Sequence, residues 1–526
     1  MPIAPVATPR ISVHLYKTIS RKTVDGQAGV SARYQGKSEF IDLTPFLNDR
    51  SAVRTTKSVR DPAGAFSITF ADKADKSYAS AVGFLTGGAD LESIYGLVEP
   101  MDLVEIRMWS GIGPAPTRRN PVAAEYPVYP LVMRGFVSEV QRQQTMGSDG
   151  RPQRQVVISG QDYGKIWQMY QVLYLAAYLE GKPLLTNFSL FELFGIKAQN
   201  TMPAGEFVRT MIDKVINPHL EGFMPENSTL PRQLLTTDDS ILVKHGVINN
   251  SYQNMQGSVY DILKFHADVG VWNELYTEDR EDGVHVVYRP IPALHLSTPD
   301  GKDSRKIQDD APDPVYVDVP AARVQSLSTA RSDANVANFF WVDGSRYDLI
   351  TDTQSRLAAI PANDARVSLK DYPNAAQKYY GVRPMYASTQ QGEDGIKTAT
   401  SGQSKDGYKD TSEKMERWID KRRRLMLEMN RDNVIFERGT ATIKGGPMRA
   451  DGIETMKAGD YARFRFGRLE FEAYVVQIEH NFQPFQGYTT SLTYERGTGF
   501  SERAQMDGGM ASPWLAEQAS NSWSVT

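Results

Sequence analysis

The chain has 526 residues, enough for roughly two to four domains, with a formal net charge of −4 and a sequence pI of about 6.1. This acidic balance argues against a surface built to neutralise nucleic-acid phosphates. Because there is no cysteine, disulfides, thiolate zinc sites and thiol nucleophiles are excluded. We expect neither a signal peptide nor a membrane anchor, since the N-terminus lacks an apolar segment and no apolar run approaches a bilayer span.

Alternating strands predominate in the first 164 residues. The segment Phe66-Ser-Ile-Thr-Phe70 places its apolar side chains on one face, as in an antiparallel strand buried on one side. Three further strands are predicted, at Asp102–Met108, Arg134–Val140 and Arg154–Gly160. A loop rich in Gly and Pro occupies 110–130. We assign residues 1–164 to a first β-barrel with an N-terminal arm.

The pattern then changes to helical spacing. Apolar residues recur three and four apart from Gly164 onward, and two more helices are predicted at 204–217 and 257–269. Residues 165–271 should therefore form a mostly helical domain. The sequence Glu281-Asp-Gly283 between two β-rich runs predicts a hairpin.

Residues 272–345 should supply the early strands of a second barrel, including one at 337–342. A helical insertion at 346–430 follows them. It contains a polar stretch at 386–410 that we expect to be a mobile loop, and then a helix from Thr411 or Ser412 to about Asn430. Residues 431–499 should hold the late strands of the second barrel, and 500–526 an extended tail.

Three late strands repeat the early pattern. They are Asp460–Phe466, Glu472–Ile478 and Tyr488–Tyr494, and both sets begin with an acidic residue after a turn. The alternating residues Ala462, Phe464 and Phe466 occupy positions that correspond to Val104, Ile106 and Met108 in the early strand. We interpret this as a duplication; the alternative is that two unrelated β-meanders share generic patterning.

Motifs in the late copy resemble a known family. They lie in Phe436–Gly452, with its Gly-Gly-Pro turn, in Tyr474–Phe482, with its histidine, and in the Thr-rich Thr489–Gly497. Together they resemble the C-terminal barrel of bacteriophage baseplate hub proteins, which are related to late-control tail proteins and to the hub part of type VI secretion spike proteins. Looser matches extend the likeness over most of 50–497.

The resemblance implies an α+β chain with two tandem tail-tube-like antiparallel β-barrels and inserted helical or mixed domains. It implies a homotrimeric, non-enzymatic virion protein that joins a hexameric tail tube to a separate trimeric spike. Further partners would be surrounding baseplate proteins and the tape-measure protein, and DNA would pass through the lumen during genome ejection. Assembly would occur in the host cytoplasm, and the helical excursions favour a contractile tail.

No catalytic, cofactor or metal site is predicted. The seven histidines lack metal-binding spacing, and His480 is expected to bond a neighbouring backbone group. The acidic cluster Asp279, Glu281 and Asp282 reads as charges at a hairpin tip. For Lys421-Arg-Arg-Arg424, a solvated helix face is favoured over a nucleic-acid contact, with a subunit contact as the middle reading.

Six arginines are the predicted interface residues: Arg107, Arg134, Arg463, Arg465, Arg422 and Arg423. The first four should alternate outward on barrel strands whose apolar residues face inward. The rival function is a tail-associated peptidoglycan hydrolase, whose paired carboxylates could be brought together only by the fold. A carbohydrate-binding module has no row of tryptophans in the sequence to support it.

Overall fold

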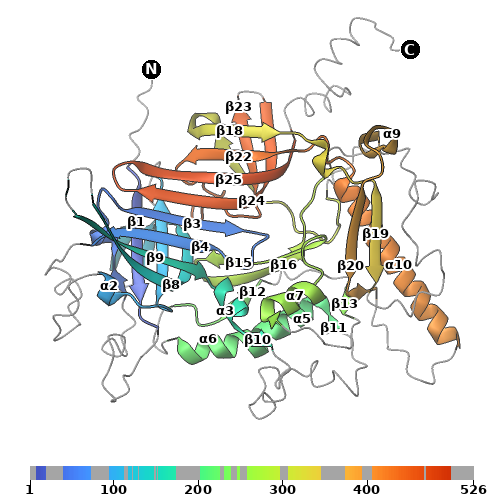
Figure 1. The fold of residues 1–526 in the computed structure, drawn as a ribbon, viewed down its shortest axis with the longest axis horizontal. Helices are drawn as coiled ribbons and strands as arrows, with labels where there is room; N and C mark the ends of the chain where they lie inside the picture. Colours follow the sequence, from blue (N-terminus) through green and yellow to red (C-terminus); the bar gives the residue numbers. More distant parts are fainter. Residues whose placement is uncertain are drawn as a thin grey trace, which may run out of the picture.

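The computed structural model describes residues 8–18, 40–72, 94–111, 117–120, 123–127, 129–146, 150, 152–172, 202–224, 230–237, 246–248, 257–295, 306–344, 373–393, 405–466 and 469–498. The molecule is built around one large sheet, with helices below it and a long helix on one side (Figure 1). No helix in these residues is long and apolar enough to cross a membrane.

The large sheet has thirteen strands, eleven of which follow one another in the order β18-β22-β25-β24-β3-β4-β9-β8-β5-β1-β2, while β23 and β17 branch from β24. The early strands are β1 (Arg10–Tyr16), β2 (Ile41–Asp42), β3 (Ala52–Ser58), β4 (Ala65–Ala71), β5 (Leu103–Trp109), β8 (Leu131–Met146) and β9 (Pro152–Asp162). The late strands are β17 (Tyr316–Pro320), β18 (Val324–Ala330), β22 (Glu437–Lys444), β23 (Tyr461–Phe466), β24 (Leu469–Gln483) and β25 (Gly487–Thr498).

Each half of the sheet curls around its own apolar core. The early core joins residues of distant strands, such as Val13 on β1 and Ile68 on β4, and is covered by α2 (Ile94–Leu97). The late core likewise joins Val317 on β17 to Ile443 on β22. Residues on well-separated strands can share a core only if the sheet bends strongly, as it does in a barrel.

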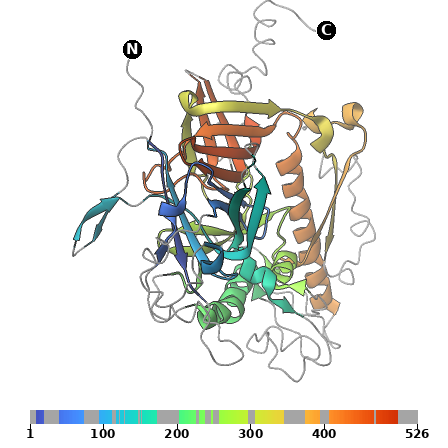
Figure 2. The same ribbon diagram turned by 60° about the vertical axis from the view of Figure 1, so that its left-hand side comes forward.

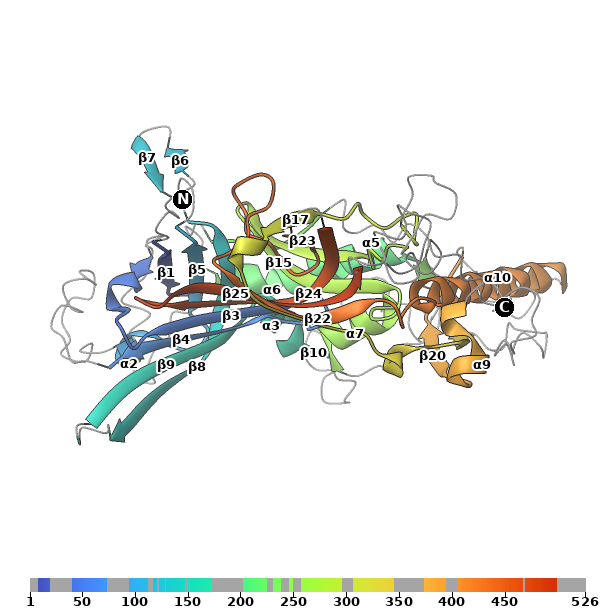
Figure 3. The same ribbon diagram turned by 90° about the horizontal axis from the view of Figure 1, so that it is seen from above.

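The sheet is mostly antiparallel and does not close into a barrel within the described chain. Two separate barrels are therefore not confirmed. The α+β class holds at the coarser level of a large sheet with a minority of helix. The β8–β9 hairpin extends well beyond the rest of the sheet when the molecule is seen from above (Figure 3).

A group of helices lies beneath the sheet. It consists of α3 (Gly164–Met169), α5 (Ala204–Met211), the π-helical turn η5 (Ile212–Ile216), α6 (Asn217–Phe223) and α7 (Val259–His266). The helices predicted at 204–217 and 257–269 are confirmed, and Ser258 caps α7 in a capping box with Asp261. The helical spacing predicted past residue 172 lies outside the described residues.

The hairpin predicted at Glu281–Gly283 forms between β15 (Asn273–Arg280) and β16 (Gly283–Pro290). It pairs with β12 (Leu234–Thr236) in a separate three-stranded sheet, and it does not join the late strands with which the predicted second barrel grouped it. Short strand pairs link the helices to their surroundings: β10 (Gln171–Val172) with β14 (Gly257–Ser258), and β11 (Met202–Pro203) with β13 (Val247–Ile248) and β21 (Gln391–Gly392).

A module on one side of the molecule contains the long helix α10 (Lys405–Asn430), seen upright in Figure 2. It packs on the parallel pair β19 (Phe339–Gly344) and β20 (Pro384–Thr389), next to α9 (Gln377–Tyr380). The mobile loop predicted at 386–410 is wrong over 386–392, which lie in β20 and β21, and over 405–410, which lie in α10. The part between 394 and 404 lies outside the described residues.

The loop predicted at 110–130 contains a small hairpin of β6 (Thr117–Asn120) and β7 (Ala123–Pro127). It projects from the body of the molecule near β1 and β5 (Figure 3). The predicted tail at 500–526 lies outside the described residues.

Candidate assembly interface

The two halves of the large sheet repeat one arrangement of strands. In the early half the order is β3-β4-β9-β8-β5, and we call these five strands the early unit. In the late half the order is β18-β22-β25-β24-β23, and these five strands are the late unit. The β8–β9 ladder has a bulge between Val137 and Glu139, and the β24–β25 ladder has one between Val475 and Gln477. Because bulges occupy defined positions in related sheets, this agreement makes coincidence a poor explanation.

Asp102 and Asp460 occupy equivalent positions and cap equivalent turns. Asp102 accepts a hydrogen bond from the Glu99 backbone N–H at 2.8 Å, and Asp460 accepts one from the Lys457 backbone N–H at 2.9 Å. The Val137 N–H then donates to the Asp102 carbonyl at 2.8 Å, as the Val475 N–H does to the Asp460 carbonyl at 2.9 Å. The acidic residue recurs because it caps the turn that precedes β5 in the early half and β23 in the late half.

A cross-strand pair is inverted between the two units. In the early unit, Phe66 on β4 lies opposite Gly160 on β9. In the late unit the order is reversed, with Gly439 on β22 opposite Tyr494 on β25. A side chain at Gly160 would lie 2.4 Å from the Phe66 ring, so an aromatic residue covers a glycine in both units.

The two units meet at β24. Residues 469–474 of this strand pair with β23, and on the same edge residues 477–482 pair with β3 of the early unit. At this junction His480 lies opposite Thr55 and Asn481 opposite Arg54. Side chains on β24 alternate between buried and half-buried there, which is typical of a strand paired on both sides.

His480 is buried in this junction. Its Nδ1 lies 2.8 Å from the Tyr488 hydroxyl and 3.0 Å from the Thr490 hydroxyl, so its partners are side chains and not the backbone group we predicted. Burial lowers its pKa to about 3, and the ring is therefore neutral. The histidine is part of the internal packing of the two units.

Two strand edges lack this kind of partner among the described residues. In β8, residues 131–136 pair with β5, but residues beyond 137 pair only with β9. In β18, the edge opposite β22 carries no strand. Residues 138–146 and 324–330 are exposed or half-exposed throughout, without the alternation seen at the internal junction. These two segments are the β8 edge and the β18 edge.

The β15–β16 hairpin ties the two units together through buried ion pairs. Lys57 of the early unit binds Asp279 of the hairpin and Asp162 (3.1 Å). Lys457 of the late unit binds Glu278 at 3.3 Å. Asp279 is therefore buried and paired with the half-buried Lys57, and it is not a solvated charge at a hairpin tip. Breaking one side of such a pair leaves a charge uncompensated.

The predicted interface residues Arg107 and Arg134 are buried in the same contact. Arg107 binds Glu281 of the hairpin tip at 2.8 Å, and both arginines bind Glu105. Burial alone would raise the pKa of Glu105, but the two guanidinium groups lower it below its usual value. The expected outward alternation fails because β5 and β8 are covered by the hairpin.

Arg463 and Arg465 lie on β23 nearer the surface. Arg463 binds Glu472 at 3.0 Å and stacks on Tyr316, and Arg465 binds Asp318 at 3.3 Å with about half of its side chain exposed. All four barrel arginines thus have partners within the chain. A contact of any of them with another subunit stays a prediction.

In the cluster 421–424, the solvated helix face is wrong for two residues. Arg422 and Arg423 are 4% and 3% exposed, whereas over half of the Arg424 side chain is exposed. The Arg422 guanidinium lies 4.2 Å from the Trp418 ring centroid and 5.4 Å from that of Trp272. Cation–π contact lets this arginine enter the core of the α10 module.

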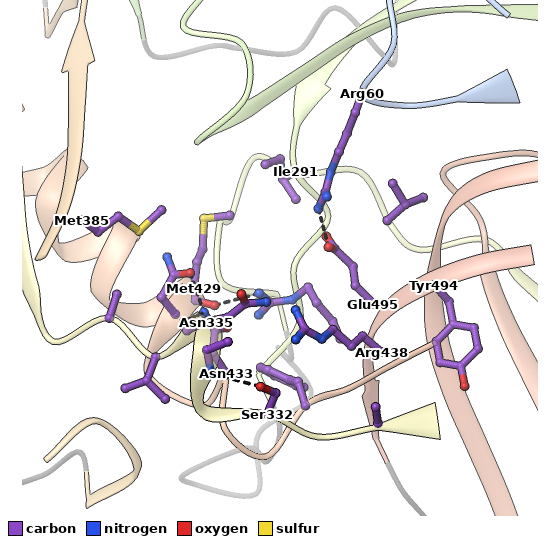
Figure 4. A pocket seen from close by; sticks show the side chains of 18 of the residues that line it. Arg60, Ile291, Ser332, Asn335, Met385, Met429, Asn433, Arg438, Tyr494 and Glu495 are labelled. Atoms are coloured by element: carbon purple, nitrogen blue, oxygen red, sulfur yellow. Dashed lines mark hydrogen bonds and ion pairs between the residues drawn. The ribbon is translucent and has the colours of Figure 1, made fainter. Parts of the chain in front are cut away.

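A hollow of about 850 Å³ borders the Ala330 end of the β18 edge. Figure 4 shows Arg60 pointing toward Glu495, with Arg438 and Tyr494 on the strand side and Met429 and Asn433 near the end of α10. Arg496 donates to the Met429 carbonyl at 2.7 Å. The hollow separates the large sheet from the α10 module beside the β18 edge.

Within the described residues, no group of three His, Asp or Glu side chains is placed to hold a metal ion. His285 lies 2.9 Å from Asp282, while His295 lies beside Glu428 and Arg431. The structure gives these histidines separate surroundings.

No protein-family model and no curated protein matches the sequence. Among solved structures, a tail protein from Neisseria meningitidis MC58 has 9% identity and a TM-score of 0.40, covering 93% of this chain and 96% of its own. The prophage MuSo2 43 kDa tail protein from Shewanella oneidensis has 10% identity and a TM-score of 0.39, with coverage of 93% and 96%. Prophage tail protein gp18 from Listeria monocytogenes EGD-e has 10% identity and a TM-score of 0.38, with coverage of 97% and 99%. All three are described as tail proteins, and the last two come from prophages.

Proposed function

We propose that this chain is a non-enzymatic hub of a phage tail baseplate. As a homotrimer, it would join the hexameric tail tube to a separate trimeric spike and form part of the channel for genome ejection. The observation that carries the proposal is the repeated strand unit, with matching bulges and matching capped turns, laid edge to edge in one sheet.

The duplication suits a change of symmetry. Three copies of a chain with two similar units present six similar units in a ring, which can meet six tube subunits. The parts that are not repeated are the helices beneath the sheet and the α10 module. In a trimer, these parts would have threefold symmetry. A trimeric spike and the surrounding baseplate proteins would contact these parts.

The channel follows from the same arrangement. In a ring of curled sheets, one sheet face lines a central passage, through which the tape-measure protein and then DNA would move. With an overall charge of −4, the chain is not built to hold phosphates tightly, which suits transit better than binding. The protein would act in the virion after assembly in the host cytoplasm.

The test is the size and symmetry of the purified chain. Sedimentation at rising concentration should give a species of three chains, and electron micrographs should show a ring with threefold symmetry and six similar lobes. A chain that remains a monomer at the highest attainable concentration would contradict the proposal. Activity on a peptidoglycan zymogram would instead favour the rival hydrolase function.

A further inference from the structure

The internal junction of the two units provides a template for a contact between chains. On β24, the edge beyond β23 is occupied by β3 of the other unit. On β8, the equivalent edge beyond β5 carries no strand among the described residues. The equivalent of β3 in the late unit is β18, whose outer edge is likewise unpaired in the described chain. The β8 edge is equivalent to the β24 side of the internal junction, and the β18 edge is equivalent to its β3 side. Each chain therefore carries both strand edges that are needed to repeat this junction between two chains.

We propose that the β8 edge of one copy pairs antiparallel with the β18 edge of the next copy. This inference rests on the proposed trimer and names the strands that build it. Three such contacts would join the open sheets into one closed ring, in which every unit is bonded to its neighbour by the same kind of strand pairing. Closure would remove the unpaired edges, which otherwise invite uncontrolled association.

The strand ladders define the register of this contact. The shared bulge makes Gln143 on β8 equivalent to Asn481 on β24. The pairing of β3 with β4 and of β18 with β22 makes Ser328 equivalent to Arg54. Because Asn481 lies opposite Arg54 inside the chain, Gln143 should lie opposite Ser328 of the neighbouring copy.

The polar composition of the two edges is compatible both with a hydrated single chain and with pairing between chains. The β8 edge reads Ser-Glu-Val-Gln-Arg-Gln-Gln-Thr-Met, and β18 reads Val-Gln-Ser-Leu-Ser-Thr-Ala. Their polar side chains can be hydrated in the single chain and still leave the backbone groups free to pair. The strand contact is narrow, so we expect trimer formation to depend on concentration.

The extended part of β8 is held in place before pairing. Arg142 binds Asp72 at 2.8 Å, and its guanidinium lies 4.6 Å from the centre of the Tyr95 ring. Gln143 and Gln155 are joined across the hairpin by a 2.6 Å hydrogen bond. These contacts order the strand beyond β5, which reduces the entropy lost when a second copy binds.

The absence of cysteine allows a direct test by disulfide trapping in the full chain. We would make Gln143→Cys, Ser328→Cys and the double variant. After oxidation, neither single variant should form covalent dimers, whereas their mixture should form dimers only. The double variant should form covalent species up to three chains and no larger, since the contact is head-to-tail and the ring closes.

The matched control is Gln143→Cys combined with Ser326→Cys, which keeps the residue type and the exposure but moves the thiol two residues along β18. The two Cα atoms would then be about 9 Å apart, beyond the reach of a disulfide. We expect on the order of tenfold less covalent product from this pair than from the in-register pair.

The outcomes separate the two proposals. A trimer by sedimentation in which only the 143–328 pair cross-links supports the strand contact. If a trimer forms but this pair does not cross-link, or cross-links no better than the control, the strand contact is overturned while the proposed hub function still stands. Covalent species of four or more chains overturn the closed ring. A chain that neither associates nor cross-links overturns the hub itself.

Discussion

The neutral histidine in the junction should make the fold sensitive to acid. His480 is 4% exposed, and burial lowers its pKa from 6.5 to about 3. The folded state disfavours the charged ring. The free energy of unfolding is therefore not reduced by His480 above pH 6.5, and it decreases as the pH falls from 6.5 toward 3. At 1.36 kcal/mol per pKa unit, the full loss is at most about 5 kcal/mol, and about 2 kcal/mol is lost by pH 5.

The test compares the pH dependence of two chains. His480→Gln keeps a group that can bond the Tyr488 and Thr490 hydroxyls but does not titrate. Urea unfolding at pH 7.5 and pH 5, at one low chain concentration, should show a fall in the free energy of unfolding that is about 2 kcal/mol smaller in the variant than in the wild type.

His480→Asn is a second variant in case the glutamine does not pack. The comparison is made within each variant, so a general loss of stability from the substitution cancels. Equal pH dependence in the wild type and in both variants would refute the assignment of a buried neutral histidine at this junction.

Three further predictions concern the repeat and the α10 module. Asp460→Asn should lower the free energy of unfolding by about 3 kcal/mol, because it removes the buried carboxylate that pairs with the half-buried Arg449; a loss below about 0.5 kcal/mol in urea unfolding would contradict this. Arg422→Met should destabilise more at pH 7.5 than at pH 5, since it removes the charge facing buried Asp268, whose raised pKa of about 6 then rises further; a pH-independent change in the thermal midpoint would argue against it. Gly160→Ala should cost more than about 3 kcal/mol or prevent folding, because the added carbon would lie 2.3 Å from a backbone oxygen, and a variant that unfolds at the wild-type midpoint would disprove that close packing.

Local signals in the sequence were sufficient to predict the repeated strands. Asp102 and Asp460 come directly before β5 and β23 because an acidic side chain can cap the preceding turn, which is a short-range interaction. The alternation of apolar residues likewise follows from the two-residue period of a strand. The helices at 204–217 and 257–269 were predictable for the same reason, since their apolar spacing lies within one segment.

Other features depend on contacts between distant parts of the chain. The burial of Arg107 and Arg134 was missed because Glu281, which binds Arg107, lies far along the sequence. Trp418 lies one helical turn from Arg422 in α10, but Trp272, the second ring that this arginine contacts, lies far from it in the sequence. A solvated arginine and a buried, paired one have the same local sequence signal, so only the fold distinguishes them.

The sequence by itself determined that the chain contains one strand pattern twice, because turn caps and apolar alternation depend only on residues that are close together in the sequence. The tertiary structure decided that β24 joins the two copies through β3, and that within the described residues the early β8 and the late β18 each have an edge without a strand partner. Strand pairing depends on which edges meet in space, and residues hundreds of positions apart in the sequence share no local pattern from which that meeting can be predicted.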